Sequence, residues 1–126
     1  MLSARVKLVV VRCVAWMLAS TIAALSVIPA SSRPVTSTGH NFEHLAIFLT
    51  FGFTFTVGYH RSPTRTLFHI VLFASLIEIV QIFIPGRHAR LFDFCLDAAA
   101  SGLGWLLAIT LFRWWPALQI DRTRNM

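Results

Sequence analysis

Four long apolar runs dominate this chain and limit what it can fold into. They extend over residues 8–28, 44–59, 66–84 and 91–112, and most of them are long enough to cross a bilayer as an α-helix. A backbone inside lipid must satisfy its own hydrogen bonds, which leaves only helices and closed barrels. A barrel would show many short segments of alternating polarity, and here the runs are continuous. We therefore predict an all-α integral membrane bundle of about four transmembrane helices, forming a single domain over residues 1–126.

The composition agrees with a membrane protein and argues against a nucleic-acid partner. The 126 residues are 56% hydrophobic, and their mean hydropathy is +0.70. The formal charge of +6 would suit nucleic acid only if the basic residues gathered on one solvated face. Nearly all of them lie in the tails and in the segments between apolar runs, where membrane proteins keep their topology signals.

The Lys and Arg residues also predict the orientation of the chain. With four spans, the side that holds both termini carries Arg5, Lys7, Arg61, Arg65, Arg113, Arg122 and Arg124. The opposite side carries only Arg33, Arg87 and Arg90. Because cytoplasmic loops are enriched in Lys and Arg, we predict a multi-pass protein of the cell membrane with both termini in the cytoplasm.

The first two apolar runs differ in length. The first follows a basic start and ends at Pro29, as a signal peptide does, but it is longer than the apolar core of a signal peptide, so an uncleaved helix is favoured. The second, residues 44–59, reaches only about 24 Å as a helix and must thin the bilayer or use its flanks.

Polar side chains inside the third and fourth runs are the clearest functional signal. Glu78, Gln81, Asp93 and Asp97 all lie there, and an ionised carboxylate at membrane depth costs at least ~2.5 kcal/mol. Such residues must face protein or water. At 1.5 Å per residue, Glu78 and Asp97 lie roughly 10 and 9 Å from the turn that joins the two runs, so the two carboxyl groups can meet.

The helical phase of the fourth run supports this cluster. Asp93, Asp97, Ala100 and Gly104 share one face, which changes from acidic to small along the helix. Small residues allow close packing deep in the bundle, and the acidic half would open toward the outer surface.

The second run and the turn complete the predicted cluster. Glu43 and His44 lie at the outer end of the second run, and Arg87 or Arg90 in the turn is the natural counter-charge. The full predicted set is Glu43, His44, Glu78, Gln81, Arg87, Asp93 and Asp97. Residues 40–44 also read H-x-x-E-H, an inverted zinc-protease motif, but a zinc site needs a further ligand on a neighbouring helix. We favour interfacial hydrogen bonding for these residues and predict no metal and no other cofactor.

With these residues the chain resembles members of the VanZ-like family. The resemblance covers about residues 25–110 and rests on Glu43-His44, an aromatic-rich helix, the string Glu78-x-x-Gln81-x-x-x-Pro-Gly-Arg87, and Asp93. It implies a membrane protein of four or five helices, in a family whose name-giving member is linked to reduced susceptibility to teicoplanin-type glycopeptide antibiotics. The chain departs from the common family pattern at Asp97, where Asn is frequent, at Ala100, where Gly is frequent, and at His40-Asn41, where Asp-Lys is often found.

Three classes of function fit these residues. The first is a non-enzymatic envelope protein that binds membrane lipid, or a lipid-linked or cell-wall-related ligand, at the outward-facing cluster. The second is an intramembrane enzyme in which Glu78 and Asp97 are the catalytic candidates and share a proton as an acid–base pair. The third is a structural or accessory subunit, in which Glu78 and Arg87 form an ion pair that clamps the hairpin. The sequence lacks a nucleophile elbow and a phosphate loop, which favours the first class over the second.

Overall fold

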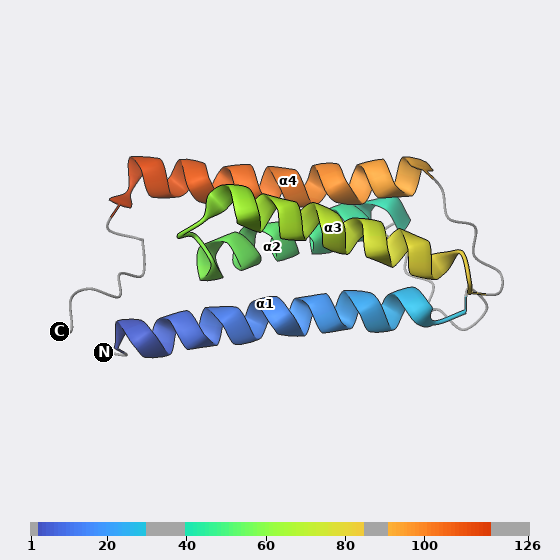
Figure 1. Ribbon diagram of the computed structural model, residues 1–126, viewed down its shortest axis with the longest axis horizontal. Helices are drawn as coiled ribbons and strands as arrows, with labels where there is room; N and C mark the ends of the chain where they lie inside the picture. The colour runs from blue at the N-terminus through green and yellow to red at the C-terminus, as the bar shows by residue number, and fades with distance from the viewer. Residues whose placement is uncertain (1–2, 30–39, 85–90, 117–126) are drawn as a thin grey trace.

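The computed structural model describes residues 3–29, 40–84 and 91–116, and their regular elements are all helices (Figure 1). The helices are α1 (Ala4–Val27), α2 (His40–Gly58), α3 (Pro63–Gln81) and α4 (Leu91–Trp114). Of these, α1, α3 and α4 are long and apolar enough to cross a membrane, whereas the apolar part of α2 is the shorter Phe42–Gly58. The prediction of an all-α membrane bundle is confirmed.

Local chemistry explains where the helices begin. Ser3 caps α1, because its hydroxyl oxygen accepts a hydrogen bond of 3.3 Å from the backbone N–H of Val6. Pro63 opens α3 three residues before the predicted start, since proline fits the first turn of a helix, where its missing N–H costs nothing. The second helix begins at His40, before its apolar run, and this lengthens the segment that the sequence analysis found short.

The third helix ends earlier than predicted. The apolar run continues to Ile84, but α3 stops at Gln81, and the chain tightens into i→i+3 hydrogen bonds, such as that of 3.1 Å from the Ile84 N–H to the Gln81 carbonyl oxygen. A residue that precedes proline, as Ile84 does, is disfavoured in the α conformation. Glu78 and Gln81 therefore lie in the last turn of the helix.

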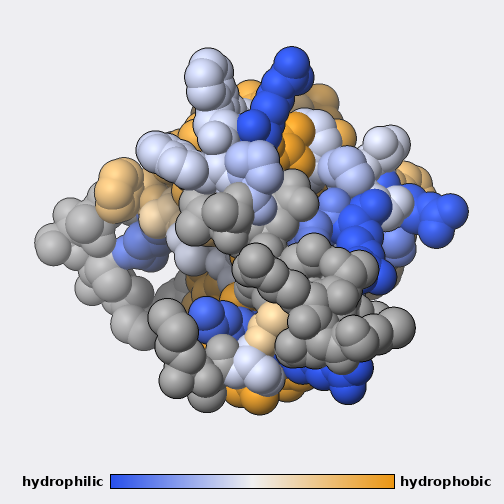
Figure 2. Space-filling model, turned by 90° about the vertical axis from the view of Figure 1, so that its left-hand side faces the viewer, coloured by the Kyte–Doolittle hydropathy of each residue, from blue (hydrophilic) through white to orange (hydrophobic). Residues whose placement is uncertain are grey.

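The helices run lengthwise in alternating directions, so the bundle has two distinct ends (Figure 1). At one end α1 and α3 finish and α2 and α4 begin. We call this the acidic end, because it holds all of the described acidic residues, namely Glu43, Glu78, Asp93 and Asp97. At the other end α2 turns into α3, beside the start of α1 and the finish of α4. The described Lys and Arg residues all lie toward this basic end, namely Arg5, Lys7, Arg12, Arg61, Arg65 and Arg113. Figure 2 looks onto the basic end, where hydrophilic side chains gather and hydrophobic ones flank them.

The closest packing in the bundle is between α2 and α4. A Cβ atom added to Gly52 would run into the backbone carbonyl of Ser101, and one added to Gly104 would run into the backbone of Leu49 and Phe53. The two helices thus touch through their backbones, as helices in membranes do where small residues meet. The predicted close packing at Gly104 is confirmed, and Gly52 is its counterpart.

Aromatic and small side chains fill the rest of the core. Phe48 and Phe51 of α2 are buried, and the Phe51 ring lies 4.9 Å, centroid to centroid, from that of Phe73 on α3. The core cluster of buried residues is Ala19, Ile22, Phe48, Phe51, Ile70, Ala74, Ile77 and Ala100. Phe48 and Phe51 of α2 are therefore packing residues.

Candidate functional site

A histidine and an aspartate from different helices meet inside the acidic end. The His44 Nδ1 atom of α2 lies 3.0 Å from Oδ1 and 3.2 Å from Oδ2 of Asp97 on α4. The Asp97 side chain is 0% exposed and that of His44 is 14% exposed. The pair therefore joins a fully buried carboxylate to a ring that still reaches the surface of the protein.

The neighbouring turns hold both residues in place. The Ser101 hydroxyl, one turn further along α4, donates a hydrogen bond of 2.7 Å to the Asp97 backbone carbonyl. The His44 ring stacks on Phe48 one turn along α2, with ring centroids 6.0 Å apart and an interplanar angle of 23°. Because Gly52 and Gly104 allow the two backbones to approach, short side chains are enough to bridge the helices.

The contact with Asp97 determines the tautomer and the orientation of the imidazole. An ionised carboxylate only accepts hydrogen bonds, so the His44 Nδ1–H donates to Asp97. In that tautomer the ring carries its lone pair on Nε2, and the carboxylate fixes the orientation of the ring. A histidine held in this way can accept a hydrogen bond from a ligand hydroxyl or take its proton.

The third helix contributes two further polar side chains. Glu78 and Gln81 lie on successive positions of one face of α3, and they are only 7% and 6% exposed. The amide nitrogen of Gln81 is buried and donates no hydrogen bond to any of the described residues. A buried amide donor of this kind normally has a partner, so its environment needs a further acceptor.

The predicted cluster lies together at one end of the bundle, with one member undescribed. Glu43 and Asp93 are half-buried in the first turns of α2 and α4, at the same end of the bundle as the buried members. Arg87, the predicted counter-charge, lies outside the described residues. The sequence predicted that the Asp97 and Glu78 carboxyl groups could meet, whereas the hydrogen bonds of the Asp97 carboxylate go to His44. The roles of these residues in binding or catalysis stay predictions.

A metal centre is not evident in the part of the chain that the structure describes. No group of three His, Cys, Asp or Glu side chains within those residues could hold an ion. The first histidine of the H-x-x-E-H motif, His40, has a side chain outside the described set, and the last, His44, turns Nδ1 to Asp97.

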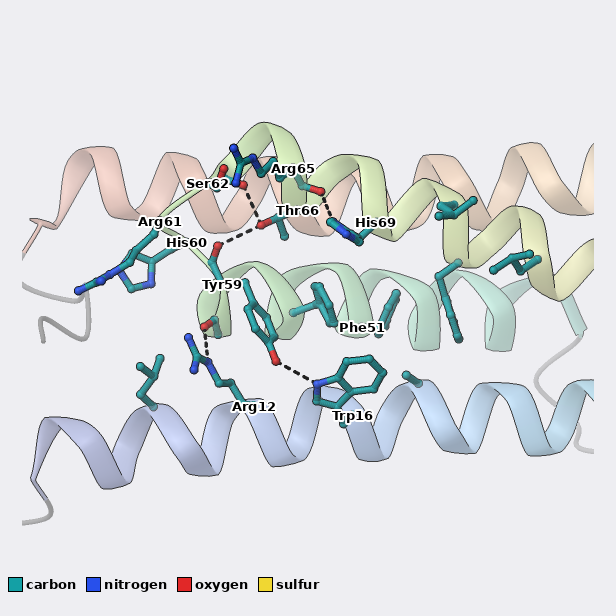
Figure 3. Close-up of a pocket in the computed structure, with 17 residues that line it drawn as sticks. Arg12, Trp16, Phe51, Tyr59, His60, Arg61, Ser62, Arg65, Thr66 and His69 are labelled. Atoms are coloured by element: carbon teal, nitrogen blue, oxygen red, sulfur yellow. Dashed lines mark hydrogen bonds between the residues drawn. The ribbon is translucent and has the colours of Figure 1, made fainter.

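Sequence reasoning missed a second polar site, at the basic end. A cavity of about 480 Å³ opens there between α1, α2 and α3, and Figure 3 shows Arg12 and Trp16 reaching across it from α1 to the end of α2. The Arg12 Nε–H donates a hydrogen bond of 3.0 Å to the Gly58 carbonyl oxygen, and the Trp16 Nε1–H donates one of 3.0 Å to the Tyr59 hydroxyl. The signal in the sequence was Arg12 itself, which interrupts the first apolar run.

A bundle of apolar helices with a buried polar cluster at one end defines a small multi-pass membrane protein. The family model described as VanZ/LLP1 matches residues 4–113, a span that reaches from the start of α1 to the last turn of α4. The chain therefore belongs to the VanZ/LLP1 family, as its resemblance to VanZ-like proteins predicted. No match was found among curated proteins or among solved structures.

Proposed function

We propose that this protein binds an envelope lipid, or a cell-wall-related ligand carried on a lipid, at the polar cluster of its acidic end. The observation that carries the proposal is the buried Gln81 amide nitrogen, which has no acceptor among the described residues, at the same end of the bundle as the His44–Asp97 pair. A cluster that served only as a clamp would use its donors within the protein. A ligand with hydroxyl, carbonyl or phosphate oxygens would supply the acceptor.

The same proposal includes the orientation of the molecule. The positive-inside rule places the basic end and both termini in the cytoplasm, so the acidic end faces the outer leaflet and the cell wall. The name-giving member of the family is linked to glycopeptide susceptibility, and a cell-wall precursor bound at this end would connect the present chain to that phenotype.

The test compares the lipids that copurify with the wild type and with one near-isosteric variant. Gln81→Met keeps the size of a side chain that is 6% exposed but removes its amide, so the variant is expected to fold and to lose the ligand. Mass spectrometry of protein purified from its native membrane would identify the copurifying lipid. Ser75→Ala is the matched control, because the Ser75 hydroxyl on the same helix donates only to the Val71 carbonyl oxygen one turn back.

Two outcomes would contradict ligand binding at the cluster. One is a Gln81→Met protein that retains the same lipid in the same amount as the wild type. The other is a wild-type protein that carries only bulk membrane lipid in bulk proportions, which would leave a structural or accessory role.

The His44–Asp97 geometry favours one alternative, acid–base chemistry on the bound ligand. His44 would then act as the base and Asp97 would orient it, in place of the Glu78–Asp97 pair that the sequence suggested; Glu78 remains a candidate acid. The expected result is that His44→Gln keeps the copurified lipid but abolishes its conversion, because general acid–base groups contribute roughly 10²–10⁴-fold to rate. If the wild type also leaves the lipid unchanged on incubation, this alternative fails and the binding proposal stands.

A further inference from the structure

We propose that the basic end carries a second, independent ligand site, for one anionic phospholipid. Its phosphate would lie at the arginines around the mouth of the cavity, and one acyl chain would lie in the apolar part between α1 and α3. This site is at the opposite end of the bundle from the polar cluster and uses none of its residues.

The lining of the cavity changes from polar to apolar along the third helix. On α3 the wall begins with Arg65 and His69 near the turn and continues through Leu72 to Leu76. At 1.5 Å per residue, Arg65 and Leu76 are about 16 Å apart along the axis, about half of the ~30 Å hydrocarbon core. The cavity therefore extends from headgroup level to the middle of the bilayer, as one acyl chain of a single leaflet does.

The walls that α1 and α2 form also change from polar at the mouth to apolar deeper in the cavity. At the mouth, the Arg12 guanidinium carbon lies 4.6 Å from the centre of the Tyr59 ring, and Trp16 bonds the Tyr59 hydroxyl. Deeper in, Phe51 and Phe55 of α2 line an apolar interior. Tyrosine favours the membrane interface, where one edge of the ring is apolar and the other is polar, and Tyr59 lies directly after the last residue of α2. Tyr59 therefore marks the polar side of the cavity, and Figure 3 shows Arg12 and Trp16 reaching toward it from α1.

The charge at the mouth is not balanced by the described residues. Arg12, Arg61 and Arg65 line the cavity, and none of the described Asp and Glu residues does. Arg12 is half-buried, has no carboxylate oxygen within 4 Å among the described residues, and bonds only Gly58 through Nε, which leaves its terminal N–H groups for another acceptor. The carbonyl end of α2 offers only about half a negative charge. An anion is therefore the complementary group.

The arginines at the mouth and the apolar lining together favour a phospholipid over other anions. Free phosphate would satisfy the arginines but leave the apolar half empty, and a volume of about 480 Å³ is in the range of cavities that hold drug-sized ligands. Leu72 and Leu76 are 42% and 50% exposed, so the apolar wall opens sideways toward lipid and a chain can enter from the bilayer. Anionic lipids are attracted to basic residues near the membrane surface by about 1 kcal/mol for each Lys or Arg, roughly fivefold in affinity.

Native mass spectrometry of the full chain in detergent would test the site. The wild type is titrated with phosphatidylglycerol, with phosphatidylcholine of the same acyl chains, and with inorganic phosphate. We expect one phosphatidylglycerol to bind about tenfold more tightly than phosphatidylcholine. The double variant Arg61→Gln/Arg65→Gln is expected to lose this preference, and both side chains are exposed, so the variant should fold.

Matched variants separate the cavity from its surroundings. Arg5→Gln/Arg113→Gln removes the same charge from exposed positions at the same end that do not line the cavity, and it should keep the preference. Leu72→Trp fills the apolar half and is expected to weaken phosphatidylglycerol binding, whereas Leu107→Trp, at an exposed position of α4 outside the cavity, should not.

The following results would overturn the proposal. Equal binding of the two lipids by the wild type, or equal loss of preference in the two double variants, would show that no specific headgroup site exists. Inorganic phosphate that displaces phosphatidylglycerol equally well in the wild type and in Leu72→Trp would show an anion site without an acyl chain. A dimer that binds no lipid would assign the cavity to a second copy. None of these results bears on the Gln81 experiment.

Discussion

Asp97 is fully buried in an apolar helix because His44, on the neighbouring helix, donates a hydrogen bond to its carboxylate. The opposite arrangement holds at Arg12, whose charge is satisfied in part by the carbonyl end of α2. In both places a polar side chain whose exposure to lipid would be unfavourable is hydrogen-bonded to a group on a neighbouring helix. Each of these hydrogen bonds therefore also fixes how two helices pack.

We expect Asp97→Ala to lower the thermal stability of the protein in detergent. The substitution removes the acceptor of the His44 Nδ1–H and opens a small void, and losses of this kind cost about 1–3 kcal/mol. Ser101→Ala is the control, since Ser101 is equally buried and its hydroxyl donates only within α4. The melting temperatures of both variants give the comparison, and an Asp97→Ala protein as stable as Ser101→Ala would mean that the pair does not support the fold.

At the residue scale, the sequence predicted which polar side chains are buried better than it predicted their hydrogen-bond partners. Glu78, Gln81 and Asp97 stand out as polar residues in apolar runs, and their burial follows from the cost of exposing them to lipid. The partner of Asp97 could not be predicted, because it depends on how α2 is rotated against α4. That rotation is determined by Gly52, which in the sequence is one small residue within a run of phenylalanines.

At the level of elements, α2 and α4 form the tightest pair in the bundle. Gly52 and Gly104 bring the two backbones into contact, and the His44–Asp97 hydrogen bond lies nearer the acidic end of the same interface. The face of α4 that the sequence predicted to pack in the bundle does so, since Asp97, Ala100 and Gly104 are all buried. The end of α3 was predicted less well, because hydropathy does not report the turn that Pro85 imposes on the residues before it.

Substitution of single glycines by alanine should test the α2–α4 contact. Gly104→Ala places a methyl group against the backbone of Leu49 and Phe53, and overpacking of this kind costs about 1–3 kcal/mol. Gly102→Ala, two residues earlier in the same helix, places its methyl group in open space and should be neutral or slightly stabilising. Thermal unfolding in detergent distinguishes them, and equal melting temperatures would contradict the contact.

At the scale of the whole molecule, charge is separated along the bundle. The described acidic residues lie toward one end and the described basic residues toward the other, with the apolar core between them. Such an arrangement favours one orientation in a membrane whose cytoplasmic surface attracts positive charge.

Thiol labelling of intact cells would check this orientation. The exposed Cys13 and Cys95 are first replaced by alanine, and single cysteines are then introduced at Ser37, between α1 and α2, and at Thr64, at the start of α3. An impermeant reagent should label the Ser37→Cys protein and leave Thr64→Cys unlabelled until the cells are opened. The reverse pattern would turn the polar cluster toward the cytoplasm and contradict a ligand from the outer leaflet.

The hydrogen bond between Arg12 and Gly58 also has a consequence for how the protein is made. The two residues are 46 positions apart, so the guanidinium is synthesised well before its acceptor. A lone arginine in an apolar helix costs up to about 3 kcal/mol during insertion by the translocon. We therefore expect α1 to remain at the translocon until α2 follows, so that the two helices leave it for the bilayer as a pair.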